Sequence, residues 1–224
     1  MLTRKVVKEK SSKTKTVIFY ENDKEIARAE YDKDWNLLKK QGTIKDGVYI
    51  QFFADSNKKE WEWTYKYEKI EGKVIQYYKT GEKHWEDNYV NGKQEGKSIG
   101  YYENGKLKYE NNYQNGKKNG AFKKYAEDGT LIFEKNYKDN IRHGITRKYF
   151  ENGNLREETN YVEGEKHGIS KRFYATGVIR RIKHYKNGVQ SGLYQKFDTA
   201  GNLKKETYIT KKSVDDDNDK EIAS

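Results

Sequence analysis

Glutamates and histidines are the residues of this chain whose spacing could support chemistry, because both recur at a fixed step. Glutamates stand 24 residues apart at Glu86, Glu110, Glu134 and Glu158. His143 and His167 are separated by one such step. Catalytic carboxylate pairs need a separation of roughly 5–9.5 Å, and two zinc ligands must each lie about 2 Å from the ion. Either chemistry therefore depends on the distance that one step spans.

The same 24-residue step runs through two glycine columns and a tyrosine column. The first glycine column comprises Gly81, Gly105, Gly129, Gly153, Gly177 and Gly201, and the second comprises Gly72, Gly96, Gly120, Gly144, Gly168 and Gly192. The tyrosine column comprises Tyr65, Tyr89, Tyr113, Tyr137, Tyr161 and Tyr185. Three columns in phase indicate one supersecondary unit stacked on copies of itself.

Each unit has the sequence of a β-hairpin. In the unit Gly144–Gly168, Ile145–Phe150 carries the β-branched and aromatic residues of a strand. Glu151–Gly153 is a turn whose Asn-Gly pair tolerates positive φ, and Leu155–Tyr161 is the returning strand. Helix is disfavoured, because each glycine costs a helix about 1 kcal/mol. We therefore predict an all-β fold, an elongated repeat array of consecutive antiparallel β-hairpins that forms one long twisted sheet.

Strand spacing converts the step into a distance. A hairpin adds two strands, each about 4.8 Å from the last, so one unit advances the array by roughly 10 Å. This separation lies outside the range of a carboxylate pair and is too long for two histidines to share a zinc ion. The chain also has no cysteine. We therefore predict a protein that is not an enzyme, with no catalytic residue, no metal site and no cofactor.

Composition predicts a thin aromatic core and acidic partners. Apolar residues make up 33% of the 224 residues and the mean hydropathy is −1.25. Such low hydrophobicity is typical of disordered chains. Twenty Tyr, eight Phe and four Trp argue against disorder, because tyrosine buries a large ring and keeps a polar group. A net charge of +11 favours acidic partners, nucleic acid or anionic membranes. The competing interpretation is that lysines solvate the sheet and protect its edges.

The chain divides by sequence into four segments. Residues 1–16 are predicted to be a flexible basic arm, and 17–71 to be degenerate repeats or an N-terminal cap. Residues 72–212 hold the regular repeats, and 213–224 are predicted to be a flexible acidic tail. The sequence contains neither a membrane-spanning apolar run nor the apolar core of a signal peptide. A cytoplasmic location and export with a removed signal both remain open.

A family resemblance is legible in Tyr102–Gly120, which reads YENGKLKYENNYQNGKKNG. This segment resembles MORN repeats, in the variant common in bacteria and found in antitoxin-like proteins of toxin–antitoxin systems. The resemblance implies an extended sheet of consecutive hairpins that serves as a scaffold or binding surface, without catalysis. It also implies protein partners, and phospholipid binding has been proposed for some members.

Aromatic columns are the candidate binding residues. One column has tyrosine at four steps, followed by Phe173 and Phe197. A second changes from Trp85, Tyr109 and Phe133 to Glu157, Arg181 and Lys205. This change indicates either a more apolar face in the first half of the array or a more basic face in the second. Aromatic strips can anchor a partner chain, whereas cross-strand packing alone would also explain them. The predicted binding residues are Trp61, Trp63, Tyr77, Trp85, Tyr101, Tyr109, Tyr125, Phe133 and Tyr149.

Three functions are consistent with these features. The leading hypothesis is a non-enzymatic repeat scaffold that binds a protein partner along its aromatic-lined face. The second is an antitoxin or immunity protein that neutralises a toxin. The third is binding to anionic membrane lipid or nucleic acid, which requires steep salt dependence. We expect a monomer and no small-molecule substrate.

Overall fold

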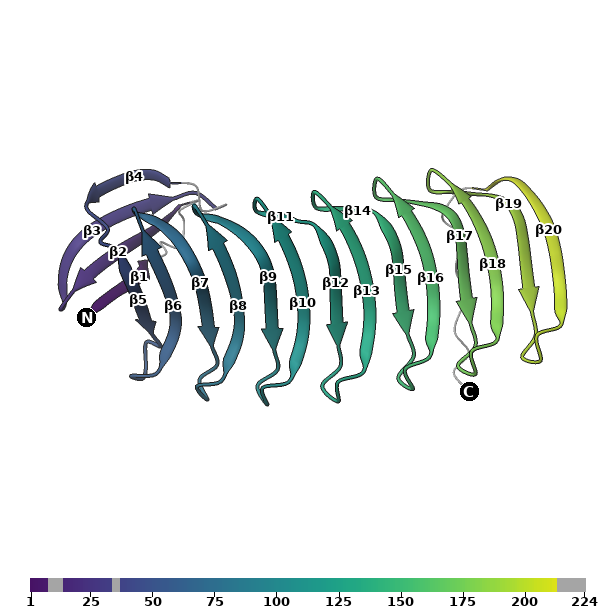
Figure 1. Cartoon of the computed structure of the whole chain (residues 1–224), viewed down its shortest axis with the longest axis horizontal. Coiled ribbons are helices and arrows are strands. Elements are labelled where there is room, and N and C mark those ends of the chain that lie inside the picture. Colours follow the sequence, from purple (N-terminus) through teal and green to yellow (C-terminus); the bar gives the residue numbers. More distant parts are fainter. Residues whose placement is uncertain (8–13, 34–36, 213–224) are drawn as a thin grey trace. The chain divides into compact units, whose positions relative to one another are not determined.

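The structure is a computed structural model that describes residues 1–7, 14–33 and 37–212. The predicted acidic tail at 213–224 lies outside the described residues, as does the stretch 8–13 of the predicted arm. The chain forms two compact units. Figure 1 labels their strands. Unit 1 comprises Met1–Leu107 with Tyr113–Gly116, and unit 2 comprises Lys108–Asn112 with Lys117–Ser224.

Unit 1 is a mixed sheet. Its strands are β1 (Leu2–Val7), β2 (Lys15–Glu21), β3 (Lys24–Tyr31), β4 (Leu37–Gly42), β5 (Gly47–Phe52), β6 (Lys59–Lys66), β7 (Lys69–Tyr77), β8 (Lys83–Val90) and β9 (Lys93–Tyr101). Consecutive strands pair antiparallel from β1 to β4 and from β5 to β9. The exception is a parallel pairing of β1 with β5, where Thr3 lies opposite Ile50.

Unit 2 consists of consecutive antiparallel hairpins. Its strands are residues 108–112 of β10 (Leu107–Gln114), β11 (Lys117–Lys118), β12 (Gly120–Tyr125), β13 (Leu131–Lys138), β14 (Ile141–Arg142), β15 (Gly144–Tyr149), β16 (Leu155–Val162), β17 (Glu165–Phe173), β18 (Ile179–Lys186), β19 (Val189–Phe197) and β20 (Leu203–Lys212). The predicted all-β fold of hairpins is confirmed. Within the described residues, no helix has the length and apolar character needed to cross a bilayer.

Two kinds of turn alternate along the repeats. At one end of the hairpins, pairs such as Asn187–Gly188 have positive φ at both residues, 49° and 78°. This is the geometry of a tight type I′ turn, which Asn and Gly adopt at low cost. At the other end only the glycine has positive φ, as at Gly153 (81°), whose N–H donates to the Phe150 carbonyl at 2.9 Å. The turn predicted at Glu151–Gly153 therefore exists, but the two-residue turns lie in the segments expected to link hairpins.

The core of unit 1 is aromatic. Phe19, Tyr49 and Tyr65 are at most 3% exposed and meet edge to face, with ring centroids 5.2–5.4 Å apart. Val17 from β2 and Val74 from β7 belong to the same cluster. This agrees with the aromatic core that the tyrosine content predicts.

The start of the chain differs from the predicted flexible arm. Leu2–Val7 form β1, which pairs with β2 and with β5. Arg4 is only 6% exposed, its guanidinium lies 3.3 Å from the Trp63 ring centroid, and it donates a hydrogen bond to the Tyr65 hydroxyl. Burial lowers the pKa of Arg4, although the Tyr65 hydroxyl acts in the opposite direction. A basic residue expected in solvent is thus part of the core, because the Trp63 ring attracts the guanidinium and the Tyr65 oxygen accepts a hydrogen bond from it.

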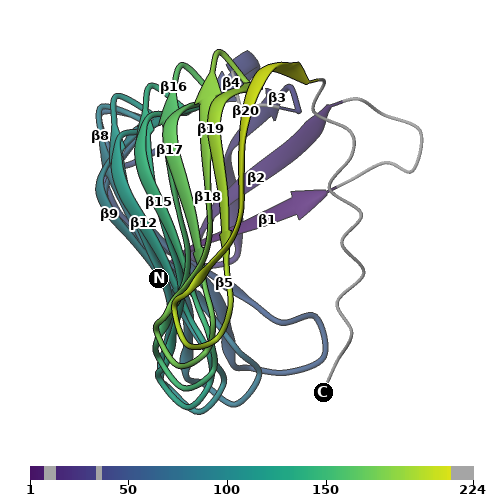
Figure 2. The same ribbon diagram turned by 90° about the vertical axis from the view of Figure 1, so that its right-hand side faces the viewer.

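Each unit has one face that buries more side chains than the other, and we call it the inner face. Side chains of directly paired residues point to the same face of a sheet. In unit 2 the inner face carries the buried residues Thr146, Glu157, Thr159, Tyr161, Arg181, Lys183 and Tyr185. The strands of unit 2 bow visibly along their length (Figure 2). The other face of each unit is called the outer face.

Candidate functional site

The predicted aromatic residues of unit 1 are divided between its two faces. Trp61, Trp63 and Trp85 lie on the inner face, where Trp61 stacks on Trp63 at 5.3 Å and meets Trp85 edge to face at 5.2 Å. Trp63 is 5% exposed and belongs to the core, with Trp61 and Trp85 packed against it. Trp63 therefore has little surface to offer a partner.

Tyr77 and Tyr101 lie on the outer face of unit 1. Gln76 pairs with Trp85 on the inner face, so the next residue, Tyr77, points the other way. Burial and the nearby charge of Glu62 raise the pKa of Tyr77, while burial and Glu86 do the same for Tyr101. These two tyrosines therefore pack beside glutamates of the outer face and do not continue the tryptophan cluster.

Unit 2 divides the remaining predicted residues in the same way. Tyr109 and Phe133 lie on the inner face with Phe122 between them, at centroid distances of 6.2 and 5.5 Å. On the outer face, the Tyr125 hydroxyl donates to Glu110 at 3.2 Å. Burial and the charge of Glu134 raise the pKa of Tyr149 there. The structure thus clusters the three tryptophans, links Tyr109 and Phe133 through Phe122, and places the four outer-face tyrosines beside glutamates. The binding role of the nine residues stays a prediction.

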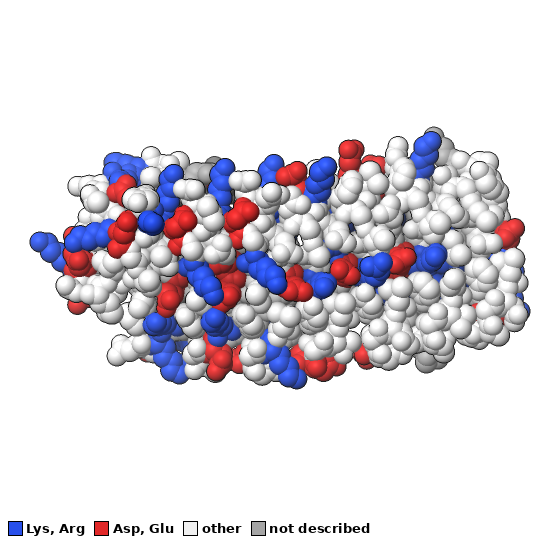
Figure 3. All heavy atoms as spheres, in the orientation of Figure 1, with Lys and Arg blue, Asp and Glu red and all other residues white. Residues whose placement is uncertain are grey.

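The outer face of unit 2 carries an alternating row of charges. The row of cross-strand partners runs Glu110, Lys123, Glu134, Arg147, Glu158 and Lys171. Ion pairs join Arg147 to Glu158 at 2.8 Å and to Glu134 at 3.7 Å. Figure 3 shows acidic and basic side chains alternating in such a stripe. Opposite charges that face each other across strands are stabilising, so this glutamate column is explained by ion pairing.

The inner face of unit 2 shows a different order. Its row of cross-strand partners runs Tyr109, Lys124, Phe133, Lys148, Glu157, Arg172, Arg181, Lys196 and Lys205. After Glu157, four cations follow on four successive strands, so like charges lie directly opposite one another. Such pairs are destabilising. The arrangement therefore needs an explanation other than the stability of the sheet.

Glu157 is the acidic member of that row. Its carboxylate lies 3.2 Å from the Arg172 guanidinium and 3.5 Å from the Lys148 ammonium, and the residue is 8% exposed. Burial by itself would raise the pKa of Glu157, but the charges of Lys148, Arg172 and Lys166 outweigh it and lower the pKa below its ordinary value. Glu157 is therefore held as a carboxylate and compensates only part of the surrounding positive charge.

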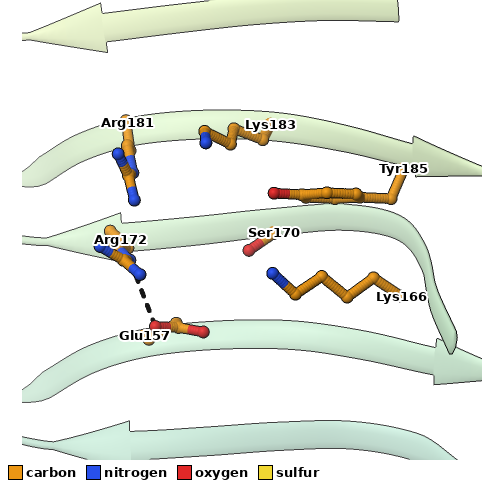
Figure 4. A pocket seen from close by; sticks show the side chains of 7 residues that line it. All are labelled: Glu157, Lys166, Ser170, Arg172, Arg181, Lys183 and Tyr185. Carbon is orange, nitrogen blue, oxygen red and sulfur yellow. Dashed lines mark hydrogen bonds and ion pairs between the residues drawn. The ribbon is translucent and has the colours of Figure 1, made fainter. Parts of the chain in front are cut away.

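A small polar pocket lies on this face. It is lined by Glu157, Lys166, Ser170, Arg172, Arg181, Lys183 and Tyr185 (Figure 4). Four lining residues are cationic and one is anionic, so the lining carries a formal charge of +3. Arg181 and Lys183 are each only 8% exposed. Concentrated positive charge in a concave polar site is suited to an anion.

Aromatic rings on the same face are covered by cations. Lys118, Arg142 and Lys166 lie 5.6, 4.5 and 4.9 Å from the ring centroids of a tyrosine column. The rings they cover belong to Tyr137, Tyr161 and Tyr185. Lys135 lies 4.3 Å from the Phe133 centroid, and burial followed by the neighbouring charges of Arg142 and Lys148 lowers its pKa. Positive charge is thus crowded along the inner face beyond the pocket.

Sequence reasoning noted part of this site and missed the rest. The sequence shows the change from Phe133 to Glu157, Arg181 and Lys205 and predicts the aromatic half as the binding surface, whereas the pocket lies in the charged half. Arg172 was missed, although it continues a basic column with Lys124, Lys148 and Lys196 at the same 24-residue step. Only the strand register shows that these two columns face each other.

A comparison with protein families finds a match to four of the repeats. The MORN repeat variant matches residues 94–115, 118–139, 142–163 and 166–187. These four segments are similar to MORN repeats. The pocket takes six of its seven lining residues from the last repeat and Glu157 from the one before it. A comparison with curated proteins found no match. MORN repeats generally form a non-enzymatic module, which fits a repeat scaffold.

Proposed function

We propose that this protein is a non-enzymatic repeat scaffold whose unit 2 binds an acidic segment of a protein partner along its inner face. The observation that carries the proposal is the run of like charges at Arg172, Arg181, Lys196 and Lys205, each directly opposite the next. The outer face of unit 2 alternates charges from Glu110 to Lys171, so the fold accommodates complementary pairing. A row of like charges that lowers the stability of the sheet is typical of a functional site.

Two other anionic partners fit the face less well. Single-stranded nucleic acid is bound by stacking bases on open aromatic faces, and here cations lie over the rings of Tyr137, Tyr161 and Tyr185. A bilayer presents a broad surface, whereas the cations Arg181 and Lys183 are buried on the inner face of bowed strands. An extended acidic peptide can reach such positions with its side chains.

The aromatic face of the leading sequence hypothesis has a smaller role in this proposal. Trp63 is core, but Trp85 and Tyr109 are only partly buried, so replacing both by alanine remains a useful second test. A toxin domain is one class of partner suggested by the resemblance to antitoxin-like proteins. Co-purification with a toxin, and rescue in a toxicity assay, would identify that class.

The test compares charge removal on the two faces of unit 2. In one variant Lys196 and Lys205 are changed to Gln, and in the matched variant the outer-face residues Lys123 and Lys171 are changed to Gln. Binding of a fluorescent glutamate-rich peptide is measured by anisotropy over a salt series. We expect the inner-face variant to bind less tightly and with a shallower salt dependence, and the outer-face variant to resemble the parent.

Two results would contradict the proposal. Equal losses for both variants would show that binding follows net charge and not the inner face. Tighter binding to an oligonucleotide or to anionic vesicles than to the peptide would assign the face to another class of partner.

A further inference from the structure

The pocket of unit 2 is built on two neighbouring cross-strand pairs. Arg172 on β17 lies opposite Arg181 on β18, and Ser170 lies opposite Lys183 one position further along the same face. Direct partners have Cβ atoms about 4.5–5.5 Å apart and diagonal neighbours about 7–8 Å apart. Three cationic side chains and one hydroxyl therefore surround a single point on the sheet.

The other lining residues either point toward that point or hold one of its side chains in position. The Lys166 ammonium and the Tyr185 hydroxyl both point toward Ser170 (Figure 4). Lys166 also lies 4.9 Å from the Tyr185 ring centroid. Glu157 accepts a hydrogen bond from Arg172 Nε at 3.2 Å and so holds that guanidinium in position. The pocket thus contains donors from two arginines, two lysines and two hydroxyl groups.

From this geometry we infer that the pocket binds a phosphoryl group carried on a side chain of the protein partner. The inference rests on the proposed function and names the chemistry of one contact within it. A phosphorylated side chain carries about −1.5 to −2 charges and three strong acceptor oxygens at neutral pH. A carboxylate offers one charge and two oxygens, which compensate less of the +3 carried by the lining residues. Opposed guanidinium groups suit phosphate oxygens because each can donate two parallel hydrogen bonds.

A phosphate ester on a side chain fits better than a lipid headgroup. Arg181 and Lys183 are each 8% exposed on the inner face. A side chain that projects from an extended peptide can enter such a depression, and the cations Lys196 and Lys205 on the adjoining strands can hold acidic residues flanking it. The phosphoryl contact then supplies specificity, while the cationic row supplies attraction.

The experiment uses the full chain and three short peptides of Glu, Gly and Ser. One has a central phosphoserine, the second an unmodified serine, and the third a glutamate at that position. Calorimetry measures their affinities for the parent and for Arg181→Gln. We expect the phosphoserine peptide to bind at least about tenfold more tightly than the serine peptide, in line with charge-assisted hydrogen bonds, and Arg181→Gln to remove most of that preference.

Arg180→Gln is the matched control, because it removes the same charge from the neighbouring exposed residue on the other face of β18. It should retain the preference for phosphoserine. Arg181→Lys keeps the charge but loses the two-pronged donor, so it should retain binding of the glutamate peptide while lowering the preference for phosphoserine. Thermal unfolding of each variant confirms that it is folded.

The possible failures are distinguishable. If all three peptides bind equally, and Lys196→Gln weakens them all, the phosphoryl inference is overturned while the proposed acidic-segment function stands. If none of them binds, both are overturned. Binding of vesicles containing phosphorylated inositol lipid more tightly than the phosphoserine peptide would contradict the side-chain source. Inorganic phosphate should compete with the phosphoserine peptide, and failure to compete would count against the pocket.

Discussion

The two units bury very different chemistry on their inner faces although both are built from antiparallel hairpins. In unit 1, Phe19, Tyr49 and Tyr65 form an aromatic cluster, and even Arg4 packs on Trp63 and donates a hydrogen bond to Tyr65. In unit 2 the inner face carries Glu157, Arg181 and Lys183, each 8% exposed. The hairpin repeat therefore fixes the backbone and leaves the inner face free to serve either as a core or as a charged surface.

Truncation of a core ring should give the largest difference in stability loss between the two units. We expect Phe19→Ala to lower the free energy of unfolding of unit 1 by about 3–5 kcal/mol, because a fully buried ring is removed from between Tyr49 and Tyr65. Phe133→Ala in unit 2 should cost less, because that ring is only half-buried. Urea denaturation followed by tyrosine and tryptophan fluorescence measures both. An equal loss in the free energy of unfolding for Phe133→Ala would contradict the difference between a packed inner face in unit 1 and a charged one in unit 2.

Arg4 tests whether the start of the chain belongs to the core of unit 1. Arg4→Ala removes the guanidinium from Trp63 and the donor from Tyr65, which should cost about 2 kcal/mol. The neighbouring Lys5 is exposed, so Lys5→Ala should change stability by less than about 0.5 kcal/mol. Both are measured by thermal and urea unfolding. If the two variants had the same free energy of unfolding, the Arg4 side chain would not contribute to the stability of the core.

Glu157 tests the charge balance of unit 2. Glu157→Gln removes the carboxylate between Arg172 and Lys148, and should lower stability near neutral pH by about 1–3 kcal/mol. Because the folded pKa of Glu157 is lowered, the carboxylate stabilises the fold above the pKa of the unfolded chain, about 4.3. That stabilisation is lost as the pH falls through the folded pKa. Urea unfolding across pH should therefore show the two proteins converging in acid, and a gap that persists there would contradict this role.

The smallest expected effects are the most diagnostic, because they differ in sign between the faces of unit 2. Lys196→Glu places an acid between Arg181 and Lys205, and should raise stability by about 0.2–1 kcal/mol while weakening acidic peptide binding. Lys171→Glu places an acid opposite Glu158 on the outer face, and should lower stability by a similar amount. Thermal unfolding measured in parallel at low salt gives both signs. The same sign for both variants would remove the basis for assigning function to the inner face.

Much of the fold was predictable from particular residues. The first glycine column marks positions such as Gly153 and Gly177, where φ is 81° and 88°, so it locates turns without further information. The N-terminal strand was not predictable in the same way. Leu2–Val7 carries two basic residues among its six, and a buried Arg4 makes sense only once Trp63 and Tyr65 are in place. The basic columns of the candidate site were visible in the sequence, but not the face that they share.

The sequence by itself determined the repeat, its hairpins and the separation between successive members of a column, because a 24-residue step combined with strand spacing fixes distances along an array. The tertiary structure alone decided which columns meet. Register shifts at Gln76/Tyr77, Lys124/Tyr125 and Arg172/Phe173 interrupt the simple alternation of side chains. A shift of one residue moves a side chain to the opposite face. The regular pairs decide the faces: Gln76 lies opposite Trp85, so Tyr77 points away from the tryptophans, whereas Arg172 lies opposite Arg181 on the face that also carries Lys183.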